Sequence, residues 1–194
     1  AIKSCTDEML WIWQQKSNNI HDLHSHIWDE WADPDGSIGK AYGYQMAQKH
    51  PYRDVKEEDL IQAFGDHWQD HATCQEDQEG KVYYMDQVDR VIYDLKTHPF
   101  SRRIMTNIYN HADLSEMNLY PCAYSMTFNV TVDPESGRHV LNAILNQRSQ
   151  DVLAANNWNV CQYAILIYML AQVCDMLPGE MVHVIADAHI YDRH

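Results

Sequence analysis

The stretch from residue 159 to residue 176 constrains the fold more than any other part of this sequence. Apolar side chains fall on most sides of a helix drawn through it, and Pro178 and Gly179 follow as helix-stopping residues. A helix that is apolar nearly all round has to be surrounded by other parts of the protein. The stretch therefore predicts a long, central, buried helix.

Alternating apolar and polar side chains mark further segments as strands. Along residues 122–132 the apolar face is formed by Tyr124, Met126, Phe128, Val130 and Val132. Residues 140–145 alternate again, so strands over 122–132 and 139–148 are predicted to pair around the turn at 133–137. A short buried strand is expected over 182–186. Helices are expected over 4–16, over 55–64 with a continuation toward His71, and over 85–96.

Length, charge and cysteine content narrow the class of protein. A chain of 194 residues with 45% hydrophobic content predicts one domain spanning 1–194. No apolar run approaches the length of a membrane span, which predicts a soluble protein. The five cysteines are odd in number and lack a CxxC spacing, which indicates a reducing compartment and a cytoplasmic location. The formal charge of −14 argues against nucleic acid as a partner.

The acidic residues are concentrated between residues 51 and 90, and residues 51–81 are interpreted as an insertion. Excess charge of this kind usually belongs to a solvated surface, which is the interpretation adopted for this segment. Two groups of side chains have spacings that could suit a metal: His21, His24 and His26, and His67, His71 and Cys74 on one predicted helical face. Zinc needs three or four converging ligands, so no metal is predicted at either group.

One cysteine stands at the start of a predicted strand. Pro121 suits the beginning of a strand rather than its interior, so Cys122 lies at an edge position outside the core. Pro-Cys at 121–122 is accompanied by Asn-Gln-Arg-Ser-Gln-Asp at 146–151 and Asp-Ala-His-Ile-Tyr at 187–191. Further blocks occupy residues 7–11, 27–31, 39–43, 101–103 and 156–164. In this order the blocks resemble the folate-dependent thymidylate synthases.

The resemblance implies an α+β fold with a twisted mixed sheet, a long central helix and a homodimer formed sheet to sheet. It implies reductive methylation of dUMP to dTMP, with 5,10-methylenetetrahydrofolate supplying both the carbon and the hydride and with no metal. Carbon 5 of uracil is a poor nucleophile until a thiolate adds at carbon 6, which is the role implied for Cys122. Free cysteine has a pKa of about 8.5, so a nearby cation must favour the thiolate, and Arg148 is the candidate.

The other roles follow from the resemblance, position by position. Asn159 would read uracil by donating to O4 and accepting from N3–H. Glu8 would organise proton transfer through water, and Tyr42 would assist proton removal at carbon 5. The residues expected to bind dUMP are Arg102, Arg103, Gln147, Arg148, Ser149, Asn159, His189 and Tyr191, the first two reaching the phosphate of the partner subunit. The residues expected to bind the folate are Ile27, Trp28, Trp31 and Asp151.

Residue types alone would favour other interpretations for several of these positions. Tryptophans at 28 and 31 are more often core residues, adjacent arginines often form exposed ion pairs, and Asn159 could simply cap a helix. Two rival functions also stay open: a deoxyuridylate hydroxymethylase of the same fold, and a non-catalytic nucleotide-binding homologue.

The sequence departs from the family's pattern in three places. Ala123 stands where many members have histidine, and residues 154–158 replace the common Leu-Gly-x-Pro-Phe. The match also begins after the family's N-terminal phosphate-binding loop and stops before its C-terminal lid. The natural polypeptide is therefore expected to be longer at both ends.

Overall fold

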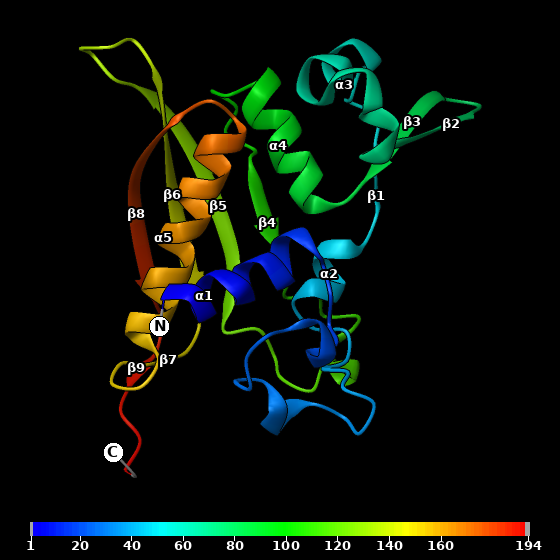
Figure 1. Cartoon of the computed structure of the whole chain (residues 1–194). Coiled ribbons are helices and arrows are strands. Elements are labelled where there is room, and N and C mark those ends of the chain that lie inside the picture. Colours follow the sequence, from blue (N-terminus) through cyan, green and yellow to red (C-terminus); the bar gives the residue numbers. More distant parts are fainter. Residues whose placement is uncertain (1, 193–194) are drawn as a thin grey trace.

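The computed structural model describes residues 2–192, and its centre is a four-stranded sheet that helices cover on one face (Figure 1). The strands, in the spatial order β4-β5-β6-β8, are β4 Met105–Asn107, β5 Ala123–Val132, β6 His139–Gln147 and β8 Leu177–Ile185. β5 and β6 pair antiparallel, whereas β6 and β8 run parallel. The predicted hairpin and the predicted mixed sheet are therefore confirmed.

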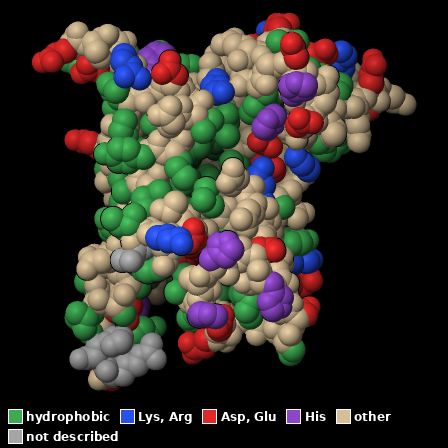
Figure 2. Space-filling view, viewed as in Figure 1, with side chains coloured by type: hydrophobic (Ala, Val, Ile, Leu, Met, Phe, Trp, Pro, Cys, Tyr) green, Lys and Arg blue, Asp and Glu red, His purple; other side chains and the backbone are tan. Residues whose placement is uncertain are grey.

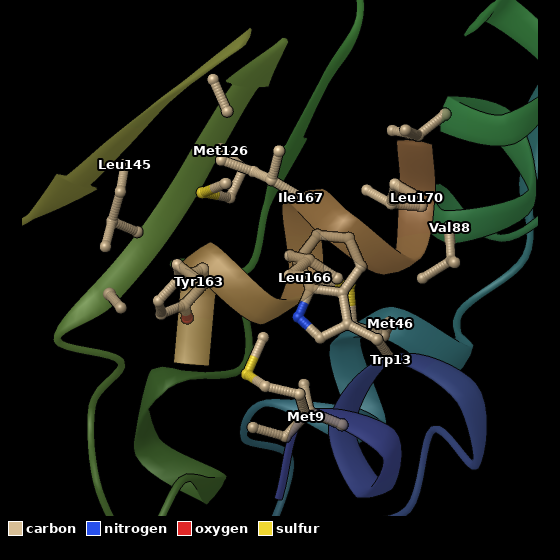
Figure 3. Close-up of a cluster of buried hydrophobic side chains, with 14 of the residues drawn as sticks. Met9, Trp13, Met46, Val88, Met126, Leu145, Tyr163, Leu166, Ile167 and Leu170 are labelled. Atoms are coloured by element: carbon tan, nitrogen blue, oxygen red, sulfur yellow. The ribbon is translucent and has the colours of Figure 1, made fainter. Parts of the chain in front are cut away.

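Helix α5, Asn156–Val173, lies against the sheet and contributes side chains to the centre of the core. Its Tyr163, Leu166, Ile167 and Leu170 pack with side chains from α1, α4, β5 and β6 (Figure 3). The prediction that this helix is buried on most sides is wrong in part, because Tyr168 is 66% exposed. The apolar sequence indicates that most faces of the helix could be buried. The elements that pack against the helix determine which of its faces are buried.

Helix α1, Ile2–Met9, continues into a π-helical turn, Leu10–Gln14, and packs against α5. This pair of elements matches the helix predicted over 4–16. The remaining short elements are α2 Gly43–Ala47, the 3-10 turns Ile20–Asp22, Asp29–Trp31 and Leu114–Glu116, and the strands β7 Gln150–Asp151 and β9 Ala188–His189, which pair in parallel. Within residues 2–192, no helix combines the length and apolar character needed to span a membrane.

Strand β8 is longer than the strand expected over 182–186, and the prediction that it is buried is wrong. Val182 and Val184 are 52% and 47% exposed, and Ile144, opposite Val182 in the ladder, is 40% exposed. A short apolar run cannot distinguish a strand covered on both faces from one covered on a single face. The outer face of the sheet thus presents an apolar surface, defined here by Ile144, Val182 and Val184.

The inserted segment folds around a small core of its own. It contains a three-stranded sheet of order β1-β3-β2 and two helices: β1 His50–Tyr52, α3 Glu57–Phe64, the 3-10 helix Gly65–Asp70, β2 Thr73–Asp77 and β3 Gly80–Met85. Helix α4, Gln87–Thr97, then returns the chain to the main core, close to the helix predicted over 85–96. The hairpin of β2 and β3 was absent from the prediction, because the mostly polar sequence of β2 lacks an alternating pattern.

Most acidic side chains of residues 51–90 lie on the surface around α3 and the β2–β3 hairpin (Figure 2). Asp86 and Asp89 do not, being only 2% and 6% exposed. Lys16 donates to both carboxylates, and His71 lies 2.9 Å from Asp89. Burial raises the pKa of Asp89 above its ordinary value. The interpretation of the whole segment as a solvated surface is therefore wrong at these two positions.

Candidate active site

A cavity of about 510 Å³ opens where the ends of β5 and β6 meet the first turns of α5. The cavity is large enough for a small-molecule site. The residues predicted from the sequence that line it are Glu8, Ile27, Trp28, Trp31, Tyr42, Cys122, Gln147, Ser149, Asp151, Asn159, His189 and Tyr191. Folding thus brings together side chains that are spread over almost the whole chain.

Cys122 immediately precedes β5. It is half-buried and lies next to Arg148. The nearer guanidinium nitrogen of Arg148, Nη2, lies 3.7 Å from Cys122 Sγ. The same guanidinium donates to the carbonyls of Pro121 and Tyr120, at 2.9 and 2.8 Å, which holds it beside the thiol. Burial raises the pKa of the Cys122 thiol, and the Arg148 charge opposes that effect. The cysteine is thus placed as a candidate nucleophile with an adjacent cation.

Tyr42 lies behind the cysteine and is almost fully buried. Its hydroxyl accepts a hydrogen bond from the backbone N–H of Cys122 at 3.1 Å. Burial raises the pKa of Tyr42 well above its usual range, so this hydroxyl stays protonated. The backbone of Tyr42 has φ of 41°, a strained conformation for a residue with a side chain. Gly43 follows because a Cβ there would lie 1.9 Å from the Ser17 carbonyl oxygen.

Glu8 is a buried carboxylate with three side-chain hydrogen-bond donors. Trp28 donates to Oε1 at 2.9 Å, while Trp158 and Gln162 donate to Oε2 at 2.8 and 2.6 Å. Burial raises the pKa of Glu8, and the three donors act in the opposite direction. A buried carboxyl whose pKa is raised in this way is suited to take part in proton transfer.

A row of side-chain amides extends from Glu8 across the floor of the cavity. Gln162 Oε1 accepts from Asn159 Nδ2 at 3.0 Å, and Asn159 Oδ1 accepts from Gln147 Nε2 at 3.2 Å. Gln147 Oε1 in turn lies 2.8 Å from Nε2 of His183, which donates to it. Burial lowers the pKa of His183. These hydrogen bonds hold each amide in a single orientation.

Trp28, Trp31 and Tyr42 form an aromatic wall of the cavity. The rings of Trp28 and Trp31 lie 5.7 Å apart, and those of Trp28 and Tyr42 lie 5.1 Å apart, both in edge-to-face geometry. Trp28 is buried, whereas Trp31 and Ile27 are more than one-third exposed at the rim. Apolar and aromatic surfaces of this kind suit a flat ring system.

The pairing of β7 with β9 sets the last group of side chains. It places Asp151 opposite His189, and His189 Nδ1 lies 2.9 Å from an Asp187 oxygen. The Asp151 carboxylate accepts from the backbone N–H groups of Leu153 and Ala154, at 3.1 and 3.0 Å. The His189 and Tyr191 rings are 4.9 Å apart. This ladder therefore holds two polar side chains and a carboxylate at one edge of the cavity.

Arg102 and Arg103 lie elsewhere. Both are exposed in the loop between α4 and β4, and neither lines the cavity. The two groups considered for metals do not converge either: Cys74 is in strand β2, away from any shared helical face, and His26 pairs with Asp29. Among the residues that the structure describes, no three histidine, cysteine or acidic side chains are arranged to hold a metal ion.

The sequence did not predict a role for Trp158, Gln162 or His183, which belong to the hydrogen-bonded network of the site. The first lies in the segment 154–158 that departs from the family's pattern, but the departure does not indicate a partner. Gln162 and His183 are polar residues within apolar stretches, and that is the signal that could have marked them.

This fold and site define an α+β protein with a cavity lined by a candidate nucleophilic cysteine, a buried carboxylate and a row of oriented amides. A cation lies beside the cysteine. A family model described as thymidylate synthase matches residues 1–194. The chain belongs to the thymidylate synthase family.

Curated relatives and a solved structure agree with that assignment. Thymidylate synthases from Bacillus subtilis subsp. natto and Bacillus atrophaeus are each 36% identical to this chain over 197 residues. The match covers 100% of this chain and 59% and 72% of those proteins, respectively. The structure of thermostable thymidylate synthase A from Bacillus subtilis aligns with a TM-score of 0.74 and 35% identity, over 99% of this chain and 58% of that one. The chain thus spans about three-fifths of the length of several relatives.

Proposed function

We propose that this protein is a thymidylate synthase, a methyltransferase that converts dUMP to dTMP with 5,10-methylenetetrahydrofolate. The observation that carries the proposal is the placement of Cys122 Sγ 3.7 Å from Arg148 in the cavity that also contains Glu8 and Asn159. Addition of the Cys122 thiolate to carbon 6 of uracil generates an enolate, and carbon 5 then attacks the activated methylene of the folate. Loss of the proton at carbon 5 breaks the bond between the methylene and the folate nitrogen, and hydride from the resulting tetrahydrofolate then completes the methyl group as the Cys122 sulfur leaves, which gives dTMP and dihydrofolate.

The polar residues of the cavity have separate roles in this proposal. Asn159 reads O4 and N3–H of uracil, and Glu8 organises proton transfer through water. Tyr42 assists removal of the proton at carbon 5. His189 and Tyr191 hold the sugar hydroxyl, and Arg148, with Gln147 and Ser149 on either side of it, binds on the phosphate side. The proposal is supported by the hydrogen bonds that link Glu8 and Asn159 through Gln162 in the cavity that Cys122 also lines.

The aromatic wall is the proposed folate site. Trp28, Trp31 and Ile27 offer apolar faces to a pterin ring, and Asp151 offers a carboxylate that can accept from its N–H groups. The bound folate would supply the one-carbon unit and the hydride, while these residues orient it toward Cys122. No metal is needed for this chemistry.

A homodimer is the proposed assembly. The apolar surface of Ile144, Val182 and Val184 lies on the outer face of the sheet, and its exposure supports pairing of two sheets face to face. Arg102 and Arg103, exposed and outside the cavity, would then bind the phosphate of the nucleotide in the partner. We further propose that residues 1–194 belong to one domain, with the acidic insertion at 51–81, and that the protein works in the cytoplasm, where its five free thiols would stay reduced.

The spectrum of the folate product tests the proposed reaction. The purified protein is mixed with dUMP and methylenetetrahydrofolate, and dihydrofolate is expected. Formation of tetrahydrofolate with a hydroxymethylated nucleotide would instead indicate a deoxyuridylate hydroxymethylase. An unchanged folate spectrum would indicate a non-catalytic binding protein, and either result would contradict the proposal.

A further inference from the structure

Gln162 lines the cavity and connects the two polar centres of the site. Its side chain is only 3% exposed. One end of its amide donates to Glu8 Oε2 at 2.6 Å, and the other end accepts from Asn159 Nδ2 at 3.0 Å. A single side chain thus bridges the buried carboxylate and the amide proposed to read the base.

The carboxylate determines which way this bridge points. An ionised carboxylate accepts hydrogen bonds and cannot donate them, so the N–H₂ end of Gln162 has to face Glu8. Trp158 and Trp28 also donate to Glu8, which keeps the carboxylate in one place. The carbonyl end of Gln162 is then left facing helix position 159, where it requires a donor.

The neighbour on the other side imposes the same orientation. Gln147 Oε1 receives the hydrogen bond from His183, so the N–H₂ end of Gln147 faces Asn159 and donates to its Oδ1. Asn159 therefore has an acceptor beside its N–H₂ group and a donor beside its carbonyl. Turning its amide by 180° would oppose two donors on one side and two acceptors on the other.

An asparagine amide has two N–H hydrogens and two acceptor positions on its oxygen. Gln162 uses one hydrogen and Gln147 uses one acceptor position, which leaves one of each for a ligand. Uracil presents an acceptor at O4 and a donor at N3. The Asn159 amide, in the orientation described, matches this acceptor and donor. Cytosine presents a donor at its amino group and an acceptor at N3, and it would match the turned amide.

We propose that Gln162 is a positioning residue that holds the Asn159 amide in the orientation that selects uracil over cytosine. The inference rests on the proposed function, because it assumes that Asn159 faces the base. Both ends of the Gln162 amide are engaged by Glu8 and Asn159, so its proposed effect on the base is exerted through Asn159. The proposed role predicts a change in the selectivity between the two bases. Loss of a residue needed only for packing would instead weaken the binding of both nucleotides alike.

Equilibrium binding of dUMP and dCMP to the parent protein and to Gln162→Met tests the proposal. Methionine keeps the length and volume of the side chain but removes both hydrogen bonds. The ratio of the dCMP to the dUMP dissociation constant is expected to fall by about tenfold in the variant, the effect of one lost polar match. Gln45→Met is the matched control, since Gln45 is also buried but bonds to Lys40 and Asp113 away from the cavity.

Glu8→Gln provides a second measurement if Gln162→Met does not fold. An amide at position 8 can donate as well as accept, so Gln162 loses its single orientation and the same ratio is expected to fall. A parent that binds neither nucleotide, or that binds both equally, would overturn the proposed function and this inference together. If the parent selects dUMP and the folded Gln162→Met variant keeps the parent's ratio of dissociation constants, this inference alone is overturned. If Gln162→Met does not fold, an unchanged ratio in Glu8→Gln has the same meaning.

Discussion

The indole nitrogen of Trp158 lies 2.8 Å from a carboxylate oxygen of Glu8, across a separation of 150 residues in the sequence. The contact joins the first turn of α5 to α1 and completes a set of three donors around one buried carboxylate. It therefore links the packing of two helices to the protonation of a side chain in the site.

We predict that Trp158→Phe raises the pKa of Glu8. Phenylalanine keeps an aromatic ring in place but lacks the N–H that stabilises the carboxylate, so burial has more effect. The other titratable side chains facing Glu8 are Cys5, Tyr42 and Tyr163, and burial raises the pKa of each, which keeps them neutral. Carbon-13 NMR of labelled glutamate carboxyl groups measures the titration directly.

The same substitution should change how stability depends on pH. The pKa of Glu8 is raised in the folded protein, so its contribution to stability is present below the unfolded pKa and lost as pH rises through the folded pKa. Stability lost in Trp158→Phe relative to the parent should therefore increase with pH above the usual carboxyl range. Urea unfolding across this range tests it, with Trp68→Phe, in the core of the insertion, as the control. An equal and pH-independent loss in both variants would contradict the prediction.

We predict that Cys122→Ala abolishes turnover while dUMP binding is largely retained. The sulfur forms the covalent bond, whereas the proposed phosphate and sugar contacts come from other side chains. Labelling with 5-fluoro-dUMP and folate, followed by peptide mass analysis, identifies the reacting thiol. Cys5 is a built-in comparison, because burial and the nearby Cys161 raise its pKa to about 11 and keep it protonated. Detection of the adduct on Cys161 or Cys174 would rule out the assignment.

We predict that Arg148→Gln slows alkylation of Cys122 by iodoacetamide at neutral pH by roughly tenfold, because loss of the arginine charge raises the thiol pKa. The substitution removes the charge 3.7 Å from the sulfur. The alkylation midpoint should therefore move to higher pH. Arg138→Gln is the control, because Arg138 lies on the exposed hairpin beside Asp175. If both variants react at the parent's rate, the arginine has no influence on the thiol.

We predict that Asn159→Asp weakens discrimination against dCMP. A carboxylate has no N–H for O4 of uracil but can accept from the cytosine amino group. The loss of one polar match costs about 1–3 kcal/mol, so selectivity should change by about tenfold or more. Comparison of kcat/KM for the two nucleotides measures it. The variant also loses its bond to Gln162, so selectivity equal to that of the parent would count against both residues.

The sequence by itself determined the family, the sheet hairpin and most of the residues around the cavity. Each of these depends on signals that are local in the chain: alternation along β5 and β6, the Pro-Cys at 121–122, and short blocks in a preserved order. Trp28 and Cys122 could be placed from such blocks because their neighbours in the sequence carry the information.

Only the tertiary structure decided which side chains meet across long separations. The exposure of Val182 and the burial of Asp86 depend on which elements pack against them, and their own sequence does not encode that. The same is true of Glu8, whose three donors come from residue 28 and from helix α5, and of Gln162, to which the sequence assigned no role. A hydrogen bond has a direction and requires two groups within about 3 Å, and only the folded arrangement supplies that distance.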